Sequence, residues 1–233
     1  MEHTQRNRLS NAERETLQQT LKQSWQDMYV LTKPEEIIPY ECDGLAAYRE
    51  IPLAVVLPET EEQVQRVLKT CKQMNIPVVP RGAGTGLAGS AMPIPDGVVL
   101  SMAKFNRILE VNQQARTATV QPGVRNLAIS EAAAQYQLYY APDPSSQIAC
   151  TIGGNVAENS GGVHCLKYGL TVNNVLKVRA ITINGDIVEF GSCAPDAPGL
   201  DLLGVLIGSE GMFCVTTVVV VKLVPMQQLA QVI

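Results

Sequence analysis

A short glycine-rich loop constrains this chain more than any other stretch of its sequence. Four glycines fall within eight residues of the run Pro80-Arg81-Gly82-Ala83-Gly84-Thr85-Gly86-Leu87-Ala88-Gly89, directly after an apolar segment, Ile76 to Val79, that predicts a β-strand. Because glycine has no Cβ atom, such a loop can adopt positive φ angles and turn consecutive N–H groups toward one bound anion. The loop therefore predicts an anion site, and a pyrophosphate is the anion that suits it best.

The spacing Gly84-x-Gly86-x-x-Gly89 also matches the dinucleotide fingerprint of Rossmann folds, but its surroundings do not. That fingerprint requires a helix to begin at the third glycine, whereas Pro93 and Pro95 follow it here and stop a helix from growing. The acidic residue expected about 20 residues further on would be Glu110, which lies in a separate strand pattern. The sequence thus disfavours a Rossmann site; a glycine-rich surface turn without a ligand is the other alternative that the loop alone leaves open.

The composition predicts a globular protein that is neither exported nor inserted in a membrane. A chain of 233 residues that is 46% hydrophobic can bury a sizeable core. Its net charge is −4 and no cluster of Lys and Arg is present, which makes nucleic acid an unsuitable partner. The first residues lack the apolar core of a signal peptide, and the longest apolar stretch, Val215 to Val224, contains two Thr and a Lys. We expect a cytoplasmic location; peripheral association with a membrane stays open.

The cysteines are widely scattered and form no C-x-x-C pair, so the sequence predicts neither a zinc site nor an iron–sulfur cluster, and no metal ligands. In a chain without an export signal they are expected to be reduced and mostly buried. The six residues are Cys42, Cys71, Cys150, Cys165, Cys193 and Cys214.

The predicted elements change along the chain from alternating strands and helices to a strand-rich order. A helix with one apolar face is expected at Asn11 to Met28, followed by an irregular connector at Thr32 to Tyr48. The remaining elements are a strand at 53–57, a helix that a capping box starts at Thr60, strands at 76–79, 98–102, 108–111 and 117–121, a helix at about 124–135, a hairpin turning at Asn184-Gly185-Asp186, a helix near 200–207 and a strand at 216–224.

A second glycine cluster runs from Pro142 to Gly162 and is rich in Gly, Asn, Ser and Thr. This composition is typical of loops and not of core, and its amides and hydroxyls suit the edge of a heteroaromatic ring and a phosphate tail. A purely structural loop is the alternative.

Five stretches, taken in order, resemble the FAD-binding domain of the vanillyl-alcohol oxidase type, and within that family the glycolate oxidase flavoprotein subunits and their D-lactate dehydrogenase relatives. The resemblance covers about residues 34–225, and the five stretches are Pro80 to Gly89, Pro122-Gly123, Pro142 to Gly162, Lys167-Tyr168-Gly169 and Gly208 to Thr216.

The resemblance implies an α+β fold with two lobes and an extended FAD between them. A small α/β lobe is expected at about 34–105 and a larger lobe with a mixed or antiparallel sheet at about 106–225. Residues 1–33 would form a helical extension, and residues 226–233 would begin a C-terminal substrate domain that this chain lacks.

The same resemblance implies which residues contact the FAD. The first loop would wrap the pyrophosphate, the second cluster would line the isoalloxazine and ribityl chain, and the stretch near residue 210 would lie by the adenosine. The residues implied are Pro80, Arg81, Gly82, Ala83, Gly84, Thr85, Gly86, Gly89, Pro122, Gly123, Asp143, Pro144, Ser145, Ser146, Thr151, Gly153, Gly154, Asn155, Glu158, Asn159, Ser160, Gly161, Glu210, Gly211, Val215 and Thr216. Arg81 either helps to bind the pyrophosphate or pairs with a surface carboxylate.

The sequence departs from the family pattern at two places. Cys214 stands where glycine is common, and Ser90-Ala91-Met92 follows the first loop where a further glycine is usual. Either departure would narrow the adenine pocket. Cys150 precedes the second glycine pair, so covalent flavin attachment is one interpretation of it; a packing residue beside noncovalent FAD is the one we expect.

No general base can be assigned from the sequence. His164 and Lys167 follow the second cluster and are the catalytic candidates, since a hydrogen-bonding or positive group near the flavin would stabilise its reduced anion. A satisfied loop histidine and a solvated lysine are the alternatives.

The resemblance implies FAD-dependent oxidation of a small 2-hydroxy acid, glycolate or D-lactate, by hydride transfer to the flavin. The implied electron acceptor is a partner subunit with iron–sulfur clusters. Two alternatives are a flavin oxidase of the same superfamily that acts on a sugar or alcohol, and a flavin-binding module without turnover.

Overall fold

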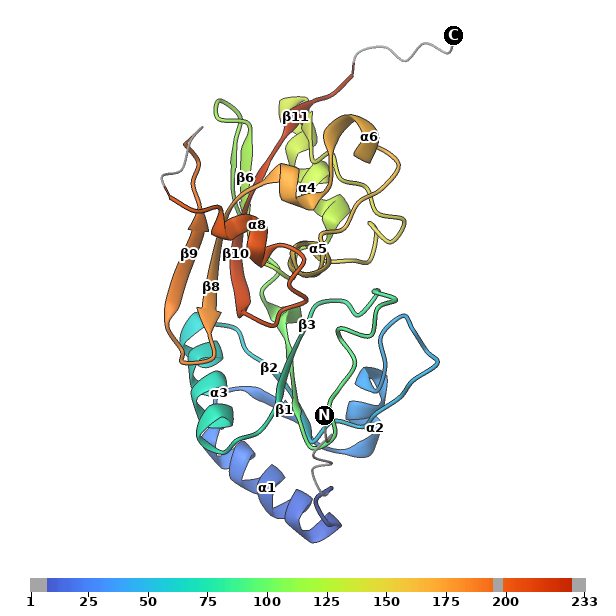
Figure 1. The fold of residues 1–233 in the computed structure, drawn as a ribbon, viewed down its shortest axis with the longest axis vertical. Coiled ribbons are helices and arrows are strands. Elements are labelled where there is room, and N and C mark those ends of the chain that lie inside the picture. Colours follow the sequence, from blue (N-terminus) through green and yellow to red (C-terminus); the bar gives the residue numbers. More distant parts are fainter. Residues whose placement is uncertain (1–7, 195–198, 228–233) are drawn as a thin grey trace.

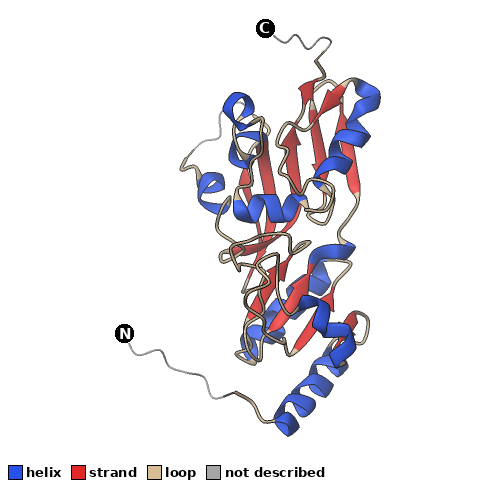
Figure 2. Cartoon of the chain, turned by 90° about the vertical axis from the view of Figure 1, so that its right-hand side faces the viewer, coloured by secondary structure: helices blue, strands red, loops and turns tan. Residues whose placement is uncertain are grey.

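The structure, a computed structural model, describes residues 8–194 and 199–227 and has two lobes stacked along its long axis (Figure 1). Each lobe is organised around its own sheet, as the view at right angles also shows (Figure 2). The α+β class and the two-lobed arrangement expected from the sequence are confirmed. No helix of the described residues is long and apolar enough to cross a membrane.

The first sheet has the strand order β1-β2-β4-β3. Its strands are β1 (Tyr29–Leu31), β2 (Ala54–Leu57), β3 (Val78–Arg81) and β4 (Val98–Ser101). Strands β2, β4 and β3 run parallel, and β1 pairs antiparallel with β2. The sequence analysis missed β1, which lies in the segment expected to be a helical extension.

Two long helices cover this sheet. Helix α1 (Asn11–Ser24) places Leu21 in the first core, and Trp25 follows directly after the helix. Helix α3 (Glu61–Gln73) buries Val64, Val67, Leu68 and Cys71 in the same core, as its spacing predicts. Met74 continues the same helical spacing in the sequence, which predicts a place on that face, but it is the C-cap residue of α3 and is exposed. In the connector after β1, the short helices α2 (Pro34–Ile37) and η1 (Ile38–Tyr40) follow each other.

The second sheet is antiparallel, with the order β5-β6-β10-β8-β9. Its strands are β5 (Ile108–Asn112), β6 (Thr117–Val120), β8 (Val175–Thr182), β9 (Ile187–Gly191) and β10 (Cys214–Lys222). The helix η2 (Met102–Lys104) follows β4 and places Met102 in the core of the first lobe. The helices of the second lobe are α4 (Asn126–Ala133), η3 (Ala134–Tyr136), α5 (Ile152–Glu158), α6 (Cys165–Tyr168), α7 (Thr171–Asn174) and α8 (Leu202–Leu206). A two-stranded sheet joins β7 (Leu138–Tyr139) to β11 (Val224–Pro225).

The apolar core of the second lobe includes residues that were expected to lie in a loop outside any core. The cluster from Pro142 to Gly162 was expected to stay outside the core, yet it contains helix α5, whose Ile152 and Val156 are fully or almost fully buried. Helix α5 packs against the second sheet because these two apolar side chains lie one turn apart on one face of the helix.

The cores of the two lobes meet through the second sheet. Ile181 of β8 and Val215 of β10 belong to the cluster that fills the first lobe. The lobes are therefore held by apolar contact on one side, which leaves the other side free to form a cleft. The lobe boundaries expected from the sequence stay predictions, and residues 1–7 and 228–233 of the expected terminal segments lie outside the described residues.

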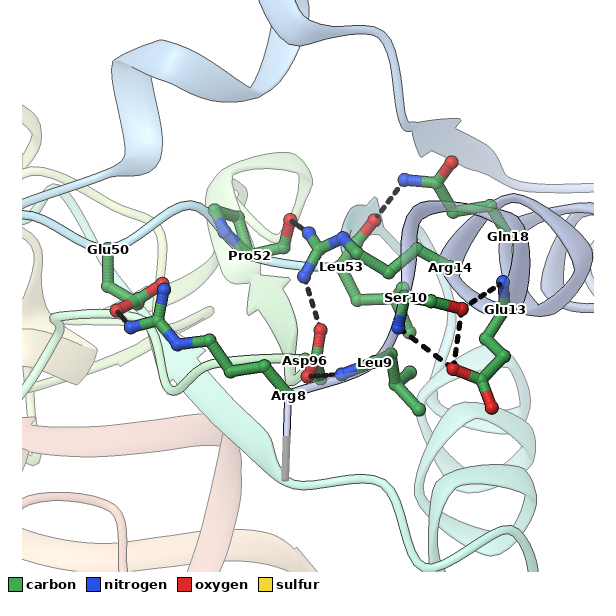
Figure 3. Close-up of polar contacts among 10 residues, drawn as sticks. All are labelled: Arg8, Leu9, Ser10, Glu13, Arg14, Gln18, Glu50, Pro52, Leu53 and Asp96. Atoms are coloured by element: carbon green, nitrogen blue, oxygen red, sulfur yellow. Dashed lines mark hydrogen bonds and ion pairs between the residues drawn. The ribbon is translucent and has the colours of Figure 1, made fainter. Parts of the chain in front are cut away.

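The start of α1 is fixed to the first lobe by a small polar cluster (Figure 3). Asp96 accepts a hydrogen bond from Leu9 N at 2.9 Å and pairs with Arg14, whose Nη2 donates to Pro52 O at 3.1 Å. Ser10 caps the helix in a capping box with Glu13. Arg8 adds a pair with Glu50, but 71% of the Arg8 side chain is exposed.

Replacing Arg14 by Met is expected to lower the free energy of unfolding by about 1–2 kcal/mol, because a partly buried carboxylate and a carbonyl lose their donor. Urea unfolding followed by circular dichroism measures this. The matched control is Arg8→Met, which should cost less than about 0.5 kcal/mol because an exposed ion pair is worth little. Equal effects of the two substitutions would contradict the anchoring role of Arg14.

Candidate cofactor site

A cleft of about 320 Å³ lies between the lobes, within the range of about 300–1,000 Å³ typical of small-molecule sites. One wall is the end of β3 with the first glycine loop, and the other is formed by α5 and the stretch from Glu210 to Thr216. The cleft therefore brings together the two glycine clusters, which lie about 70 residues apart in the chain and in different lobes.

The first glycine loop has free backbone donors. Among the described residues, the N–H groups of Ala83, Gly84, Thr85 and Gly86 donate to no protein acceptor. Gly84 has a φ of +69°, a conformation that side chains disfavour. A run of free N–H groups beside a cleft is what an anion needs, since charge-assisted hydrogen bonds can replace a cationic side chain.

Arg81 holds the loop in shape. Its side chain is buried, and Nη1 donates to Cys42 O at 2.8 Å and to Ala91 O at 3.0 Å. A Cβ atom on Gly84 would lie 2.2 Å from Arg81 Nη2, so the glycine lets the loop fold directly over the guanidinium. Burial lowers the pKa of Arg81, and the nearby Asp43 carboxylate opposes that shift. Arg81 thus binds carbonyl groups and makes no surface carboxylate pair, which was one of the two interpretations offered by the sequence.

Two residues of the connector before β2, Asp43 and Gly44, pack against the first glycine loop. The buried Asp43 accepts a hydrogen bond from Gly89 N at 2.9 Å. A Cβ atom on Gly44 would lie within 3 Å of the carbonyl oxygens of Thr85 and Gly86. This Asp-Gly pair was read from the sequence only as part of an irregular connector, and its role as a support was missed.

Helix α5 meets the loop at its first turn. Thr151 is the N-cap and accepts a hydrogen bond from Gly154 N at 3.4 Å. A Cβ atom on Gly82 would lie 2.5 Å from Thr151 Oγ1, so the loop reaches the helix only because residue 82 is glycine. On the other side of the turn, Gly153 N donates to Pro122 O at 2.8 Å.

Two polar side chains of α5 line the cleft. Asn155 is 1% exposed, and its Nδ2 atom has no hydrogen-bond partner among the described residues. A buried donor without a partner is costly, so this atom favours a ligand that accepts from it. Glu158 brings a carboxylate, which would repel a phosphate; its hydrogen bond from Ser90 Oγ partly offsets that charge.

Two buried thiols also line the cleft. Burial raises the pKa of Cys150, although the neighbouring side chains of Ser146 and Asn155 oppose that shift, and burial raises the pKa of Cys214 to about 11. Both groups are therefore protonated and weakly nucleophilic at neutral pH. This favours noncovalent cofactor binding, which stays a prediction.

The two catalytic candidates do not line the cleft. His164 donates its backbone N–H to Asp143 Oδ1 at 3.2 Å, and its Nδ1 lies 2.7 Å from Asp143 Oδ2. Lys167 places its Nζ 5.0 Å from the centre of the Tyr168 ring. Both residues lie at α6 and outside the cleft wall, and Asp143, the predicted cofactor residue that His164 contacts, does not line the cleft either.

Most predicted cofactor residues do line the cleft. They are Pro80, Arg81, Gly82, Ala83, Gly84, Thr85, Gly86, Pro122, Ser146, Thr151, Gly153, Gly154, Asn155, Glu158, Ser160, Glu210, Gly211, Val215 and Thr216.

The remaining predicted residues are not among those that line the cleft: Gly89, Gly123, Asp143, Pro144, Ser145, Asn159 and Gly161. Several of them have clear structural roles there. Gly123 N donates to Phe105 O at 2.6 Å, and Asn159 ends α5 in the left-handed conformation.

The sequence analysis did not include seven lining residues in the site: Leu87, Ser90, Ala91, Met102, Cys150, Ala157 and Cys214. Leu87, Ser90 and Ala91 adjoin the first loop and could have been found by extending it. Met102 comes from the end of the first sheet and has no local signal.

The neighbouring glycines of α5 provide a test of this packing. Gly153→Ala should lower the free energy of unfolding by about 1–3 kcal/mol, because its Cβ would lie 2.6 Å from Pro122 Cβ and overpack the contact. Gly154→Ala should leave it unchanged or raise it by up to about 1 kcal/mol, because its nearest neighbour is 3.4 Å away and alanine favours helix. Urea unfolding of both variants measures these changes. Equal destabilisation by the two substitutions would contradict the close packing of Gly153 against Pro122.

Comparisons with known proteins show the family to which this chain belongs. The profile of the FAD binding domain family matches residues 52–191. The chain is 57% identical over 225 residues to the glycolate oxidase subunit GlcD of Escherichia coli K12, covering 97% of this chain and 45% of that protein. It is 43% identical over 187 residues to the Bacillus subtilis GlcD subunit, covering 80% of this chain and 40% of that protein.

A D-lactate dehydrogenase of Anaerostipes hadrus is 37% identical over 185 residues, covering 78% of this chain and 39% of that enzyme. The chain thus spans less than half the length of these relatives.

Solved structures share the fold at low identity. An alkyldihydroxyacetonephosphate synthase aligns with a TM-score of 0.76 at 23% identity, over 86% of this chain and 38% of that chain. The Physcomitrella patens BBE-like 1 protein aligns with a TM-score of 0.76 at 23% identity, over 88% of this chain and 44% of that chain. The family resemblance and the cofactor predicted from the sequence are confirmed: the chain belongs to the FAD binding domain family, and FAD is its cofactor.

Proposed function

We propose that this chain is the FAD-binding half of an oxidoreductase that oxidises a small 2-hydroxy acid, glycolate or D-lactate. One observation carries the proposal: a cleft between two lobes is lined by a capped helix and by a glycine loop with free N–H groups, in a chain 57% identical to a glycolate oxidase subunit. When bound, the flavin supplies the chemistry by accepting a hydride from the α-carbon of the substrate.

The residues of the cleft fit an FAD. The free N–H groups from Ala83 to Gly86 are suited to the pyrophosphate, which needs donors more than cations. Asn155 Nδ2 would donate to a polar edge of the flavin or to the ribityl chain. The stretch Glu210 to Thr216 would lie by the adenosine, with Cys214 narrowing that end.

The groups that bind the substrate and act as general base would correspond to the part of these relatives that this chain does not match. His164 and Lys167 remain candidates for the flavin edge, although the cleft does not include them. A partner subunit that carries iron–sulfur clusters would accept the electrons, because the cysteines of this chain form no C-x-x-C pair and its relative is named as a subunit. A cytoplasmic location stays a prediction.

Asn155→Leu tests how the cleft uses its free donor. The apoprotein should be as stable as wild type or slightly more so, because a buried unsatisfied donor is replaced by an apolar side chain of similar size. FAD should bind about 10–100-fold more weakly, as expected when a buried hydrogen bond is lost. Fluorescence titration of the apoprotein with FAD measures the affinity. Unchanged affinity would show that Nδ2 does not contact the cofactor.

The reaction can be tested in a chimera in which this chain replaces the corresponding residues of the E. coli glycolate oxidase subunit. Anaerobic glycolate or D-lactate should bleach the visible flavin absorption of the purified chimera. A chimera that holds FAD and is bleached by sugars or alcohols, but not by 2-hydroxy acids, would overturn the substrate class. Failure of this chain to bind FAD would overturn the proposal as a whole.

A further inference from the structure

One face of helix α3 connects the two lobes on the side away from the cleft wall formed by the glycine loop. The side chains of Glu61, Gln65 and Lys72 recur at helical spacing and all contact the second lobe. Gln65 Nε2 donates to Gly185 O at 2.6 Å, and Lys72 Nζ donates to Asn184 Oδ1. In Figure 1, α3 lies beside the end of the β8–β9 hairpin. Thus α3 buries its apolar face in the first lobe and presents a polar face to the second.

The strongest of these contacts is a cluster of three residues. Arg179 Nε donates to Glu61 Oε1 at 3.0 Å, and Arg179 Nη2 donates to Glu61 Oε2 at 3.0 Å. Thr217 Oγ1 donates to Glu61 Oε1 at 2.5 Å, and Thr217 is completely buried. One carboxylate of the first lobe thereby joins two strands of the second. The forked geometry of arginine matches a carboxylate at both oxygens.

Thr217 has a special place in β10. The register of β10 against β8 shifts between Thr216 and Val218, so Thr217 is the extra residue of a β-bulge. Bulges redirect a side chain and bend the strand locally. The residues on one side of this bulge, Val215 and Thr216, line the cleft. The hydrogen bond to Glu61 therefore holds β10 at its bulge, directly beside two residues that line the cofactor site.

We propose that Glu61, Arg179 and Thr217 are positioning residues for FAD: they hold the bulged part of β10 at a set distance from the first lobe and so determine cofactor affinity from outside the cleft. This inference rests on the proposed function, because it takes FAD as the ligand of the cleft. None of the three residues lines the cleft, so their effect on affinity would pass through the strand.

The charge state of the cluster suits this role. Burial pushes the pKa of Glu61 upward, but hydrogen bonds from Arg179 and Thr217 outweigh it and leave the pKa below its ordinary value. The carboxylate is therefore charged at neutral pH and accepts from both neighbours. As a pair at 21% and 35% side-chain exposure, Glu61 and Arg179 add little to overall stability. Their value lies in holding one geometry.

The test compares isosteric and conservative variants at residue 217. Thr217→Val removes the hydroxyl and keeps the shape, and FAD should bind about tenfold more weakly, because the bulge of β10 loses the hydrogen bond to a charged group that holds it in place. Thr217→Ser keeps the hydroxyl and should bind FAD within about twofold of wild type, by the same reasoning. Glu61→Gln should behave like Thr217→Val. Quenching of FAD fluorescence on titration of each apoprotein measures the affinity.

Asp27→Asn is the matched control. Asp27 pairs with Arg66, which lies on α3 as Glu61 does. This pair stays within the first lobe and is exposed, so its loss should change FAD affinity less than about twofold. Wild-type affinity in both Thr217→Val and Glu61→Gln would overturn the positioning role and leave the proposed function intact. An equal loss in Asp27→Asn would also overturn it, because the effect would then come from α3 in general. A wild-type protein that binds no FAD would overturn the proposed function as well.

Discussion

The close approach of two backbones, at Gly82 and the N-cap of α5, is the constraint on which the rest of the site depends. A side chain at residue 82 would collide with Thr151 Oγ1, so glycine is what allows a loop of the first lobe to meet a helix of the second. The apolar contact of Ile181 and Val215 brings the lobes together on one side. On the other side, the contact between Gly82 and Thr151 sets how closely the two lobes approach. The cleft is the space that remains between these two contacts.

The polar groups around this cleft divide into two kinds. Those that shape it are satisfied: Arg81 donates to two carbonyls, and Asp43 accepts from the loop. Others among the lining residues keep free hydrogen-bonding capacity within the described part of the chain, namely the N–H groups from Ala83 to Gly86 and Asn155 Nδ2. Since buried polar groups are normally paired, the buried Asn155 Nδ2 favours a ligand that accepts from it.

Much of the fold could be predicted from the sequence because its signals are local. The hairpin at Asn184-Gly185 and the buried face of α3 follow from turn chemistry and from helical spacing. Helix α5 was missed because Gly153 and Gly154 have low helix propensity; burial of its two apolar residues and the Thr151 cap stabilise it, and these are tertiary effects. Strand β1 is three residues long and depends on pairing with a distant β2. Most of the cofactor residues were predicted by family resemblance, whereas supports such as Asp43 and Met102 carry no local pattern.

The measurement that tests the central claim most directly is a comparison of FAD with riboflavin in titrations of the same apoprotein. Riboflavin has the ring and the ribityl chain of FAD but lacks both the pyrophosphate and the adenosine. If the free N–H groups of the first glycine loop bind the pyrophosphate, FAD should bind at least about 100-fold more tightly, the equivalent of two charge-assisted hydrogen bonds. Equal affinities for the two flavins would contradict the account, because the loop would then have no anion to bind.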